Sequence, residues 1–207
     1  MLSSKAQNLD LLKKIFKNNK NIIIPEYFYF KKKDFKKNKN KLLKKILKLN
    51  KNFKLILRSS AKDEDGIYKT LAGKYSSISI NNEGIKSINS KLGSFLKQFK
   101  NPNDEIIIQY KISKVNLSGV IFTSDINFNS PYYLINYDNS GKTDLITSGV
   151  KNEKKKQLII YKRFEKKNKF SSLIAVCKTL EKKINNFRLD IEFAIKNNKI
   201  YLFQIRY

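Results

Sequence analysis

The side chains best suited to chemistry lie in the last stretch of the chain, "DIEFAIKNNKIYLFQIRY", residues 190–207. Its apolar residues alternate on both sides of an Asn-Asn pair, which predicts a β-hairpin. Four polar side chains interrupt the apolar strands: Asp190, Glu192, Gln204 and Arg206. Carboxylate and amide oxygens are ligands that Mg²⁺ prefers, and a fixed guanidinium stabilises the charge on a transferring phosphoryl group. One hypothesis is therefore a metal site with Arg206 beside it, and the other is an ordinary cross-strand ion pair.

Arg206 is a candidate functional residue because arginine is scarce in this chain. The chain has 44 lysines and arginines, of which only four are arginines: Arg58, Arg163, Arg188 and Arg206. We predict a three-residue hairpin loop, residues 197–199. That register pairs Asp190 with Arg206 and Glu192 with Gln204 on one face, and leaves the other face apolar. A two-residue Asn-Asn turn would shift the register by one and mix polar with apolar partners.

The second candidate stretch is "LILRSSAKDEDGIYKTLAGKYSSI", residues 55–78, in which an apolar strand leads to Arg58. The later residues Thr70, Leu71, Ala72 and Gly73 are small or flexible enough for backbone N–H groups to approach phosphate oxygens, and Thr70 adds a hydroxyl. The alternative is a surface hairpin with charged turn residues.

The third stretch is "EIIIQYKISKVNLSGVIFTSD", residues 105–125. Its segment Gln109, Tyr110, Lys111 and Ile112 could form an edge that reads an adenine through backbone hydrogen bonds. The alternative is a plain core strand.

Composition narrows the function classes. The 207 residues are 41% hydrophobic, enough for a packed core, and include no histidine and one cysteine. The absence of histidine excludes Ser-His-Asp catalysis, His-ligated metals and a phosphohistidine on the chain itself. The net charge of +27 comes from scattered lysines, so specific nucleic-acid binding is not expected. No apolar run reaches a membrane-spanning length and no signal peptide is recognised, so we expect a cytoplasmic protein without a membrane partner.

The periodicity predicts helices at residues 3–17, 37–52, 83–99 and 171–185, with strands between them. One apolar strand is predicted at residues 21–30, with Pro25 inside it. The Asn-Pro-Asn at 101–103 predicts a boundary, giving an N-terminal lobe at 1–103 and a C-terminal lobe at 104–207. Intermixed helices and strands favour two α+β lobes around a cleft.

Taken together, "LRSSAKDEDG…TLAGKYSSI", "IIIQYKI…LSGVIFTSD" and "LDIEFAI…KIYLFQIR" resemble, in order, the nucleotide-binding domain of the pyruvate phosphate dikinase and phosphoenolpyruvate synthase family. The family consensus is close to R-S-S-A-x-x-E-D…F-A-G, V-x-Q-x-M…S-G-V-x-F-T and D-x-E…Q-x-R-P. The start, "SSKAQNLDLL…IIIPEYFYF", is similar to the family's G-G-K-x-x-x-L…V-P-x-G-F. The resemblance covers nearly the whole chain. It implies an α+β, ATP-grasp-like fold whose two lobes have mainly antiparallel sheets flanked by helices, with Mg·ATP held between them.

The resemblance also implies residue roles. Lys5 matches a lysine that contacts ATP phosphates, Arg58 matches the arginine of R-S-S-A, and Arg206 matches the arginine near the γ-phosphate. Residues 70–73 match the phosphate-covering loop and residues 109–112 the adenine-facing hinge. Glu192 and Gln204 match the Mg²⁺-associated pair, with Asp190 beside them as a further nucleotide-binding residue.

The chain also departs from the family. Ser3 and Ser4 replace the glycine pair before Lys5, and the family's G-x-G-E segment appears as "NYDNSGKTDLITSG", without its glutamate. Asp138 or Asp144 could substitute for that glutamate. The chain is shorter than the family's nucleotide domain and lacks the phosphohistidine and pyruvate-binding domains.

The resemblance implies an ATP-dependent phosphotransferase in which Lys5, Arg58, Arg206 and Mg²⁺ position and neutralise the transferring group. The acceptor would lie outside this chain, as a histidine on a partner domain or a small-molecule hydroxyl. A non-catalytic nucleotide-binding or regulatory module is the alternative hypothesis, and a basic nucleic-acid-binding protein is the third.

Overall fold

The computed structural model describes residues 4–61, 77–125, 130–141, 143, 155–163 and 167–206. Within these residues the chain divides into two compact units. The first unit comprises residues 7–24 and 113–206, and the second unit comprises residues 4–6 and 25–112. Within the described residues, no helix has the length and apolar character needed to cross a membrane.

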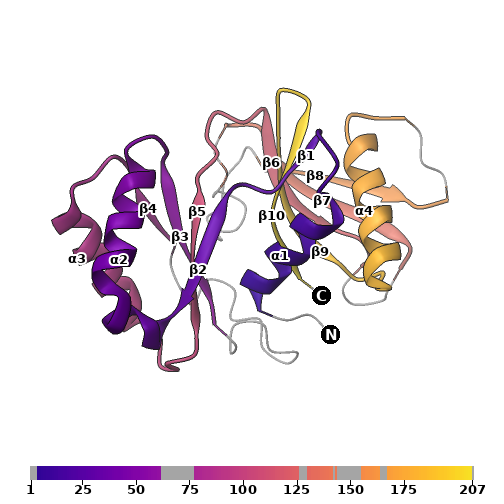
Figure 1. Ribbon diagram of the computed structural model, residues 1–207. Helices are drawn as coiled ribbons and strands as arrows, with labels where there is room; N and C mark the ends of the chain where they lie inside the picture. The colour runs from indigo at the N-terminus through magenta and orange to yellow at the C-terminus, as the bar shows by residue number, and fades with distance from the viewer. Residues whose placement is uncertain are drawn as a thin grey trace. The chain divides into compact units, whose positions relative to one another are not determined.

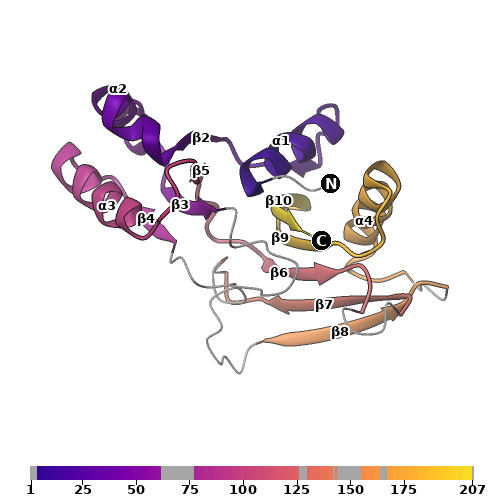
Figure 2. The same ribbon diagram turned by 90° about the horizontal axis from the view of Figure 1, so that it is seen from below.

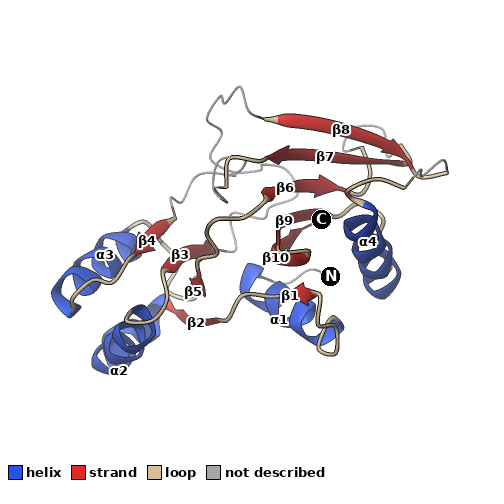
Figure 3. Ribbon diagram, turned by 90° about the horizontal axis from the view of Figure 1, so that it is seen from above, coloured by secondary structure: helices blue, strands red, loops and turns tan. Residues whose placement is uncertain are grey.

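The second unit contains a four-stranded antiparallel sheet with the order β2-β5-β3-β4. Its strands are β2 (Tyr27–Lys31), β5 (Glu105–Tyr110), β3 (Leu55–Ser60) and β4 (Ile78–Ile80). Two helices, α2 (Lys32–Asn50) and α3 (Ile85–Lys97), lie together along this sheet (Figures 1 and 3). They pack against one face of it, and the shared core includes Phe35, Ile46, Phe95, Leu57 and Ile108.

The helices of the second unit follow the predicted periodicity. Helix α2 buries Phe35, Leu43 and Ile46 at helical spacing, and its lysines are mostly exposed. It begins at Lys32, five residues before the predicted start, because Phe35 belongs to the same buried stripe. Helix α3 lies within the range 83–99 predicted for it.

The first unit contains a six-stranded sheet with the order β1-β10-β9-β6-β7-β8. Its strands are β1 (Ile22–Ile23), β10 (Lys199–Arg206), β9 (Asp190–Lys196), β6 (Leu117–Phe122), β7 (Tyr132–Asp138) and β8 (Lys156–Tyr161). Only β1 and β10 pair in parallel among these strands. Figure 2 shows β6, β7 and β8 running side by side. The expected α+β fold with mainly antiparallel sheets is therefore confirmed.

Two helices accompany this sheet. The ring of Phe170, which precedes α4 (Ser171–Ile184), packs edge-on against Tyr137 of β7 and Phe193 of β9, with centroids 5.0 and 6.4 Å away. Helix α1 (Lys5–Ile15) is tied to β10 by Asn8, whose Nδ2 donates to the carbonyl of Ile205 at 3.1 Å. Residues 5 and 6 of α1 belong to the second unit and the rest of the helix to the first.

The β9–β10 hairpin corrects one prediction and confirms another. Its turn is the two-residue Asn197-Asn198, with φ of 50° and 59°, so the predicted three-residue loop is wrong. An irregularity between Leu202 and Gln204 makes Phe203 an extra residue on β10. Beyond it, Gln204 faces Glu192 and Arg206 faces Asp190, as predicted. The bulge absorbs the shift that the tight turn introduces.

The division of the chain also differs from the predicted boundary at residues 103 and 104. Strand β5 follows that boundary in sequence, but it pairs with both β2 and β3 and so belongs to the second unit. The apolar segment at 21–30 is likewise two strands: β1 joins the first unit's sheet and β2 the second unit's, on either side of Pro25.

Candidate functional site

Arg58 and Gln109 lie on the same face of the second unit's sheet. Leu55, Leu57, Ile106 and Ile108 turn toward α2 and α3, so the residues alternating with them turn to the opposite face. We call this face, which α2 and α3 do not cover, the open face of the second unit, although Ser60, Ile107 and Gln109 on it are buried. The register aligns its members in three rows: Tyr27, Gln109, Ile56 and Ser79; Tyr29, Ile107 and Arg58; Lys31, Glu105 and Ser60.

Lys5 stands at the start of α1, where hydrogen bonds hold its neighbours. The N–H of Ala6 donates to Ser60 Oγ at 3.1 Å, and Ser4 Oγ donates to Glu105 Oε2 at 2.5 Å. Ser60 Oγ also donates to Glu105 Oε2, at 3.4 Å. The third row of the open face therefore contacts the segment that carries Lys5, which is itself 7% exposed.

In the predicted adenine-facing segment, residues 109–112, two backbone N–H groups donate hydrogen bonds within the second unit. The N–H of Tyr110 donates to the carbonyl of Glu26 and the N–H of Lys111 donates to that of Lys54. These two N–H groups are therefore occupied in this structure. Gln109 is 1% exposed, and its Nε2 has no hydrogen-bond acceptor among the described residues.

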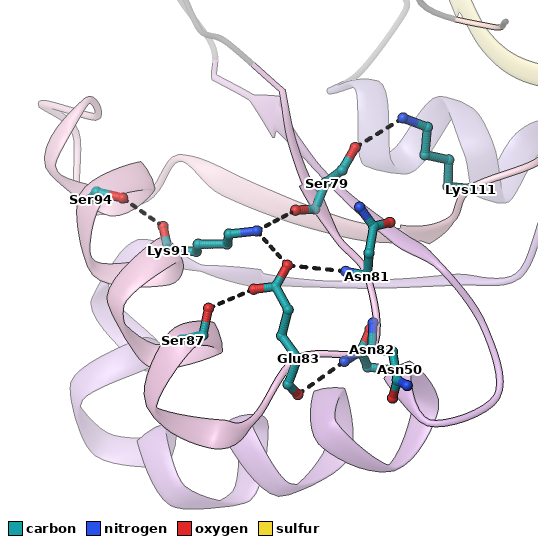
Figure 4. A network of polar contacts seen from close by, with 9 residues as sticks. All are labelled: Asn50, Ser79, Asn81, Asn82, Glu83, Ser87, Lys91, Ser94 and Lys111. Atoms are coloured by element: carbon teal, nitrogen blue, oxygen red, sulfur yellow. Dashed lines mark hydrogen bonds and ion pairs between the residues drawn. The ribbon is translucent and has the colours of Figure 1, made fainter.

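Lys111 belongs to a polar network at one end of the same sheet (Figure 4). Its Nζ donates to Ser79 Oγ at 3.0 Å, and Lys91 Nζ donates to the carbonyl of Ser79 at 2.9 Å. Lys91 also pairs with Glu83. Burial would raise the pKa of Glu83, but its bonds to Lys91, Ser87 Oγ and the Asn81 N–H together lower that pKa below the ordinary value. The network holds the β4–α3 connection.

The predicted metal residues lie on one face of the first unit's sheet. Phe193 and Tyr137 turn toward Phe170, so Asp190 and Glu192 turn to the opposite face, which we call the open face of the first unit. Gln204 is directly opposite Glu192, and both are buried, at 4% and 8% exposure. The structure thus brings the two oxygen-bearing side chains together across β9 and β10.

The adjacent row of this face contains the ion pair. Arg206 donates from Nε and Nη2 to Asp190 Oδ2, at 3.1 and 2.7 Å. Sequence reasoning placed Asp190 beside the nucleotide, and the structure shows that it also orients Arg206. The row continues through Phe122 and Leu134 to Ile159, which is 58% exposed.

Asp138 lies on the same open face. It is paired in register with Ser118, which is paired with Ala194, two residues from Glu192. Asp138 is fully buried and its Oδ1 accepts the N–H of Ser140 at 2.6 Å. Its substitution for the family's missing glutamate stays a prediction. Asp144 and the predicted phosphate loop, residues 70–73, lie outside the described residues.

The donor set on the first unit's open face suits Mg²⁺. Glu192 supplies a carboxylate and Gln204 can supply an amide oxygen, and Mg²⁺ commonly uses only one or two protein carboxylates while keeping water and phosphate oxygens. No cluster of three or more acidic, histidine or cysteine side chains suited to a metal occurs among the described residues. The residues therefore fit a metal bound together with a phosphate-bearing ligand better than a metal held by protein alone.

Sequence reasoning gave no role to three residues that the structure places beside Lys5: Ser4, which it named only as a replacement for a glycine, Ser60 and Glu105. Glu105 offered a signal, because it is an acidic residue that begins a strand of three isoleucines. A carboxylate buried at 8% exposure requires hydrogen-bond donors, and its donors come from distant parts of the sequence.

Comparison with known proteins gives a fold. No protein-family model and no curated protein matches the chain. Several solved structures do. D-alanyl-alanine synthetase A from Vibrio cholerae aligns over 97% of this chain with a TM-score of 0.55 and 9% identity. A RiPP-associated ATP-grasp ligase from Chryseobacterium gregarium, in complex with ADP and a leader and core peptide, aligns over 95% with a TM-score of 0.53 and 14% identity. D-alanine-D-alanine ligase from Helicobacter pylori aligns over 98% with a TM-score of 0.50 and 17% identity.

The chain spans about half the length of these structures, covering 54%, 50% and 53% of them. All three are named as ligases or synthetases, so they support an ATP-grasp domain and not the pyruvate phosphate dikinase family in particular. At these identities the likeness is one of fold: the chain has the ATP-grasp fold.

Proposed function

We propose that the chain binds Mg·ATP and transfers a phosphoryl group to an acceptor outside the chain. The observation that carries the proposal is the pairing of Glu192 with Gln204 beside Arg206 and Asp190, on one face of a sheet with this fold. The order of the sequence motifs supports the same reading.

Each unit contributes proposed binding residues. In the first unit, Glu192 and Gln204 would hold Mg²⁺, and the metal supplies charge neutralisation at the phosphates when bound. Arg206 would contact the γ-phosphate, oriented by Asp190. In the second unit, Lys5 and Arg58 would contact phosphate oxygens and residues 109–112 would contact the adenine. Residues 70–73 would cover the phosphates.

The chemistry required of the protein is positioning. An acceptor oxygen or nitrogen attacks the γ-phosphorus and gives up its proton to water, and the bond to the bridging oxygen breaks, so that ADP leaves with the negative charge. The guanidinium of Arg206 and the ammonium of Lys5 stabilise the charge on the phosphoryl oxygens during that step. The chain has no histidine, so a phosphohistidine could form only on a partner. A small-molecule hydroxyl is the other acceptor class.

A ligase is the second candidate function, favoured by the names of the structural neighbours. In that case the acceptor would be a carboxylate, which becomes an acyl phosphate and then reacts with an amine. A non-catalytic nucleotide-binding module remains the alternative to both.

Calorimetric titration of the protein with ATP at physiological salt, with and without Mg²⁺, tests the shared part of these proposals. We expect Mg²⁺-dependent binding of ATP. Absence of binding contradicts the proposed function and would leave a basic nucleic-acid-binding protein as the remaining hypothesis.

Arg206→Ala separates a catalyst from a binding module. We expect it to retain much of the ATP affinity and to lower phosphoryl transfer by about 10²- to 10³-fold, as for other transition-state donors. Arg163→Ala is the matched control, because Arg163 is an exposed arginine in the turn after β8. Transfer is followed with γ-labelled ATP: label on a histidine-bearing partner or a hydroxyl indicates a phosphotransferase, and phosphate release that needs both a carboxylate and an amine indicates a ligase.

A further inference from the structure

The first turn of α1 is held by residues that have no assigned role in nucleotide binding. Lys5 lies between Ser4 and Ala6, and both of these neighbours bond to the third row of the second unit's open face. The inference below rests on the proposed function, because it concerns how Lys5 is presented to phosphate.

The three hydrogen bonds form one connected chain. The Ala6 N–H donates to Ser60 Oγ, the Ser60 hydroxyl donates to Glu105 Oε2, and the Ser4 hydroxyl donates to that same oxygen. Ser60 thus accepts one bond and donates another. Glu105 only accepts, which is what an ionised carboxylate does. All three side chains are largely withdrawn from water: Ser60 and Glu105 are 1% and 8% exposed, and Ser4 is partly buried.

These hydrogen bonds supply a partner for a backbone N–H group at the start of α1. The first N–H groups of a helix lack partners within the helix, and the Ala6 N–H is one of them. Here the partner comes from a strand 54 residues away in sequence rather than from a capping residue beside the helix. The negative charge of Glu105 also lies at the positive end of the helix, which is favourable.

Ser4 contributes a hydrogen bond to Glu105 that depends on its side chain. The chain has Ser4 where the family that it resembles has the second glycine of G-G-K, and glycine has no side chain that could reach a carboxylate. The hydroxyl of Ser4 therefore adds a contact that a glycine cannot make, and it fixes the residue immediately before Lys5.

We propose that Glu105 and Ser60 are positioning residues for Lys5. Together with Ser4 they form a hydrogen-bonded group around Lys5, which we call the clasp. Glu105 holds the segment on the N-terminal side of Lys5 through Ser4, and on its C-terminal side through Ser60 and Ala6. With the backbone fixed on both sides, the lysine side chain is directed to phosphate without a large loss of freedom on binding.

The clasp is tested first in the nucleotide-free protein, by amide hydrogen exchange. Ser60→Ala removes the acceptor of the Ala6 N–H, so we expect exchange at Ala6 to become at least about tenfold faster. Ser60→Thr keeps a hydroxyl and should restore slow exchange. Glu83→Gln is the control. Glu83 is another carboxylate of the same unit that accepts a serine hydroxyl, and its substitution should leave the exchange rate at Ala6 unchanged. Unchanged exchange at Ala6 in Ser60→Ala would overturn the clasp.

The link to Lys5 is tested by the background dependence of ATP affinity. Glu105→Gln keeps an oxygen that can accept both hydroxyls but removes the negative charge that strengthens these bonds, and we expect it to weaken Mg·ATP binding by about tenfold, the scale of a hydrogen bond to a charged group. In a Lys5→Met background the same change should have no further effect. An equal loss in both backgrounds would mean that Glu105 acts through general stability, and would overturn its role as a positioning residue.

The exchange and affinity measurements distinguish failure of the proposed function from failure of the positioning role of Glu105. If wild-type protein binds no Mg·ATP, the proposed function and the role of Lys5 both fail, while the exchange measurement still decides whether the clasp exists. If ATP binds and Glu105→Gln binds it as tightly as wild type, the proposed function stands and the positioning role fails.

Discussion

Arg206 and Asp190 face each other across β9 and β10, and two nitrogens of the arginine donate to a single oxygen of the aspartate. The side chains of this pair are 27% and 19% exposed, so the guanidinium is held in place while part of it still reaches solvent. An arginine held in this way can contact an anionic ligand without first losing its own conformational freedom.

Removing that restraint gives the first prediction. Asp190→Ala should reduce phosphoryl transfer by about tenfold or more, because Arg206 must then be ordered during the reaction, and should lower the free energy of unfolding by only about 1 kcal/mol. Steady-state transfer rates and urea denaturation measure the two effects. Transfer at the wild-type rate would show that Asp190 does not orient a catalytic arginine.

Gly119 gives the second prediction. A Cβ on this residue of β6 would lie 2.2 Å from the carbonyl oxygen of Asn136 on the adjacent strand β7. The strands would have to separate, so Gly119→Ala should lower the free energy of unfolding by about 2–4 kcal/mol. Gly93→Ala is the control: Gly93 lies within α3, nothing lies within 4 Å of its Cβ position, and the change should stabilise by about 0.5–1 kcal/mol. Equal effects in the two variants would contradict the close approach at Gly119.

The Asn197-Asn198 turn gives the third prediction. Both residues have positive φ, as a type I′ turn requires, and glycine adopts that conformation at less cost than asparagine. Asn198→Gly should therefore raise the free energy of unfolding by about 0.5 kcal/mol, and Asn198→Val should lower it by about 1 kcal/mol or more. Thermal unfolding measures both changes. A three-residue loop at 197–199 would not produce this opposite response.

The fourth concerns pH and Glu83. Because the folded-state pKa of Glu83 is lowered, its ionised form stabilises the fold fully above its unfolded pKa, and that contribution is lost as pH falls through the folded pKa. Glu83→Gln removes the titrating group. The difference in unfolding free energy between wild type and Glu83→Gln should be below about 1 kcal/mol at pH 7 and shrink further between pH 5 and about pH 3. A difference that grew on acidification would contradict the lowered pKa.

The fifth concerns Cys177. Burial, and then the negative charge of Glu181, raise the pKa of its thiol far above the usual range. We expect a thiol reagent at pH 8 to label the native protein slowly, and to label it completely once the protein is unfolded in guanidinium chloride. Rapid labelling of the folded protein would show that α4 opens around Cys177.

The sequence patterns predicted the helices and the polar rows of the hairpin because these depend on local periodicity. The stripe of Phe35, Leu43 and Ile46 repeats at helical spacing, and the alternation around Glu192 repeats at strand spacing. The strand segment at 21–30 was harder to predict, since apolar character does not say which sheet a residue joins. Pro25 marked the break, yet only strand pairing shows that Ile22 and Tyr27 lie in different sheets.

The contacts around Lys5 could not be predicted from local pattern. Ser60 and Ala6 are 54 residues apart, and Ser4 and Glu105 are 101 apart. Nothing in the spacing of these residues indicates that they meet, because the tertiary contacts of residues 4–6 with β3 and β5 inside the second unit decide it. The identity of Glu105 as an acidic residue in an apolar strand was the one visible sign.

The extra residue at Phe203 has a consequence for comparing this protein with its relatives. If Phe203 were deleted, Leu202 would still face Phe193 and Gln204 would still face Glu192, so every pair of the ladder would survive. Hairpins of this kind can therefore differ in length by one residue at this position without changing which side chains meet. An alignment anchored at the turn would then displace Gln204 and Arg206 by one column. A gap at Phe203 keeps them in their own columns, and a search pattern for this site should allow that gap.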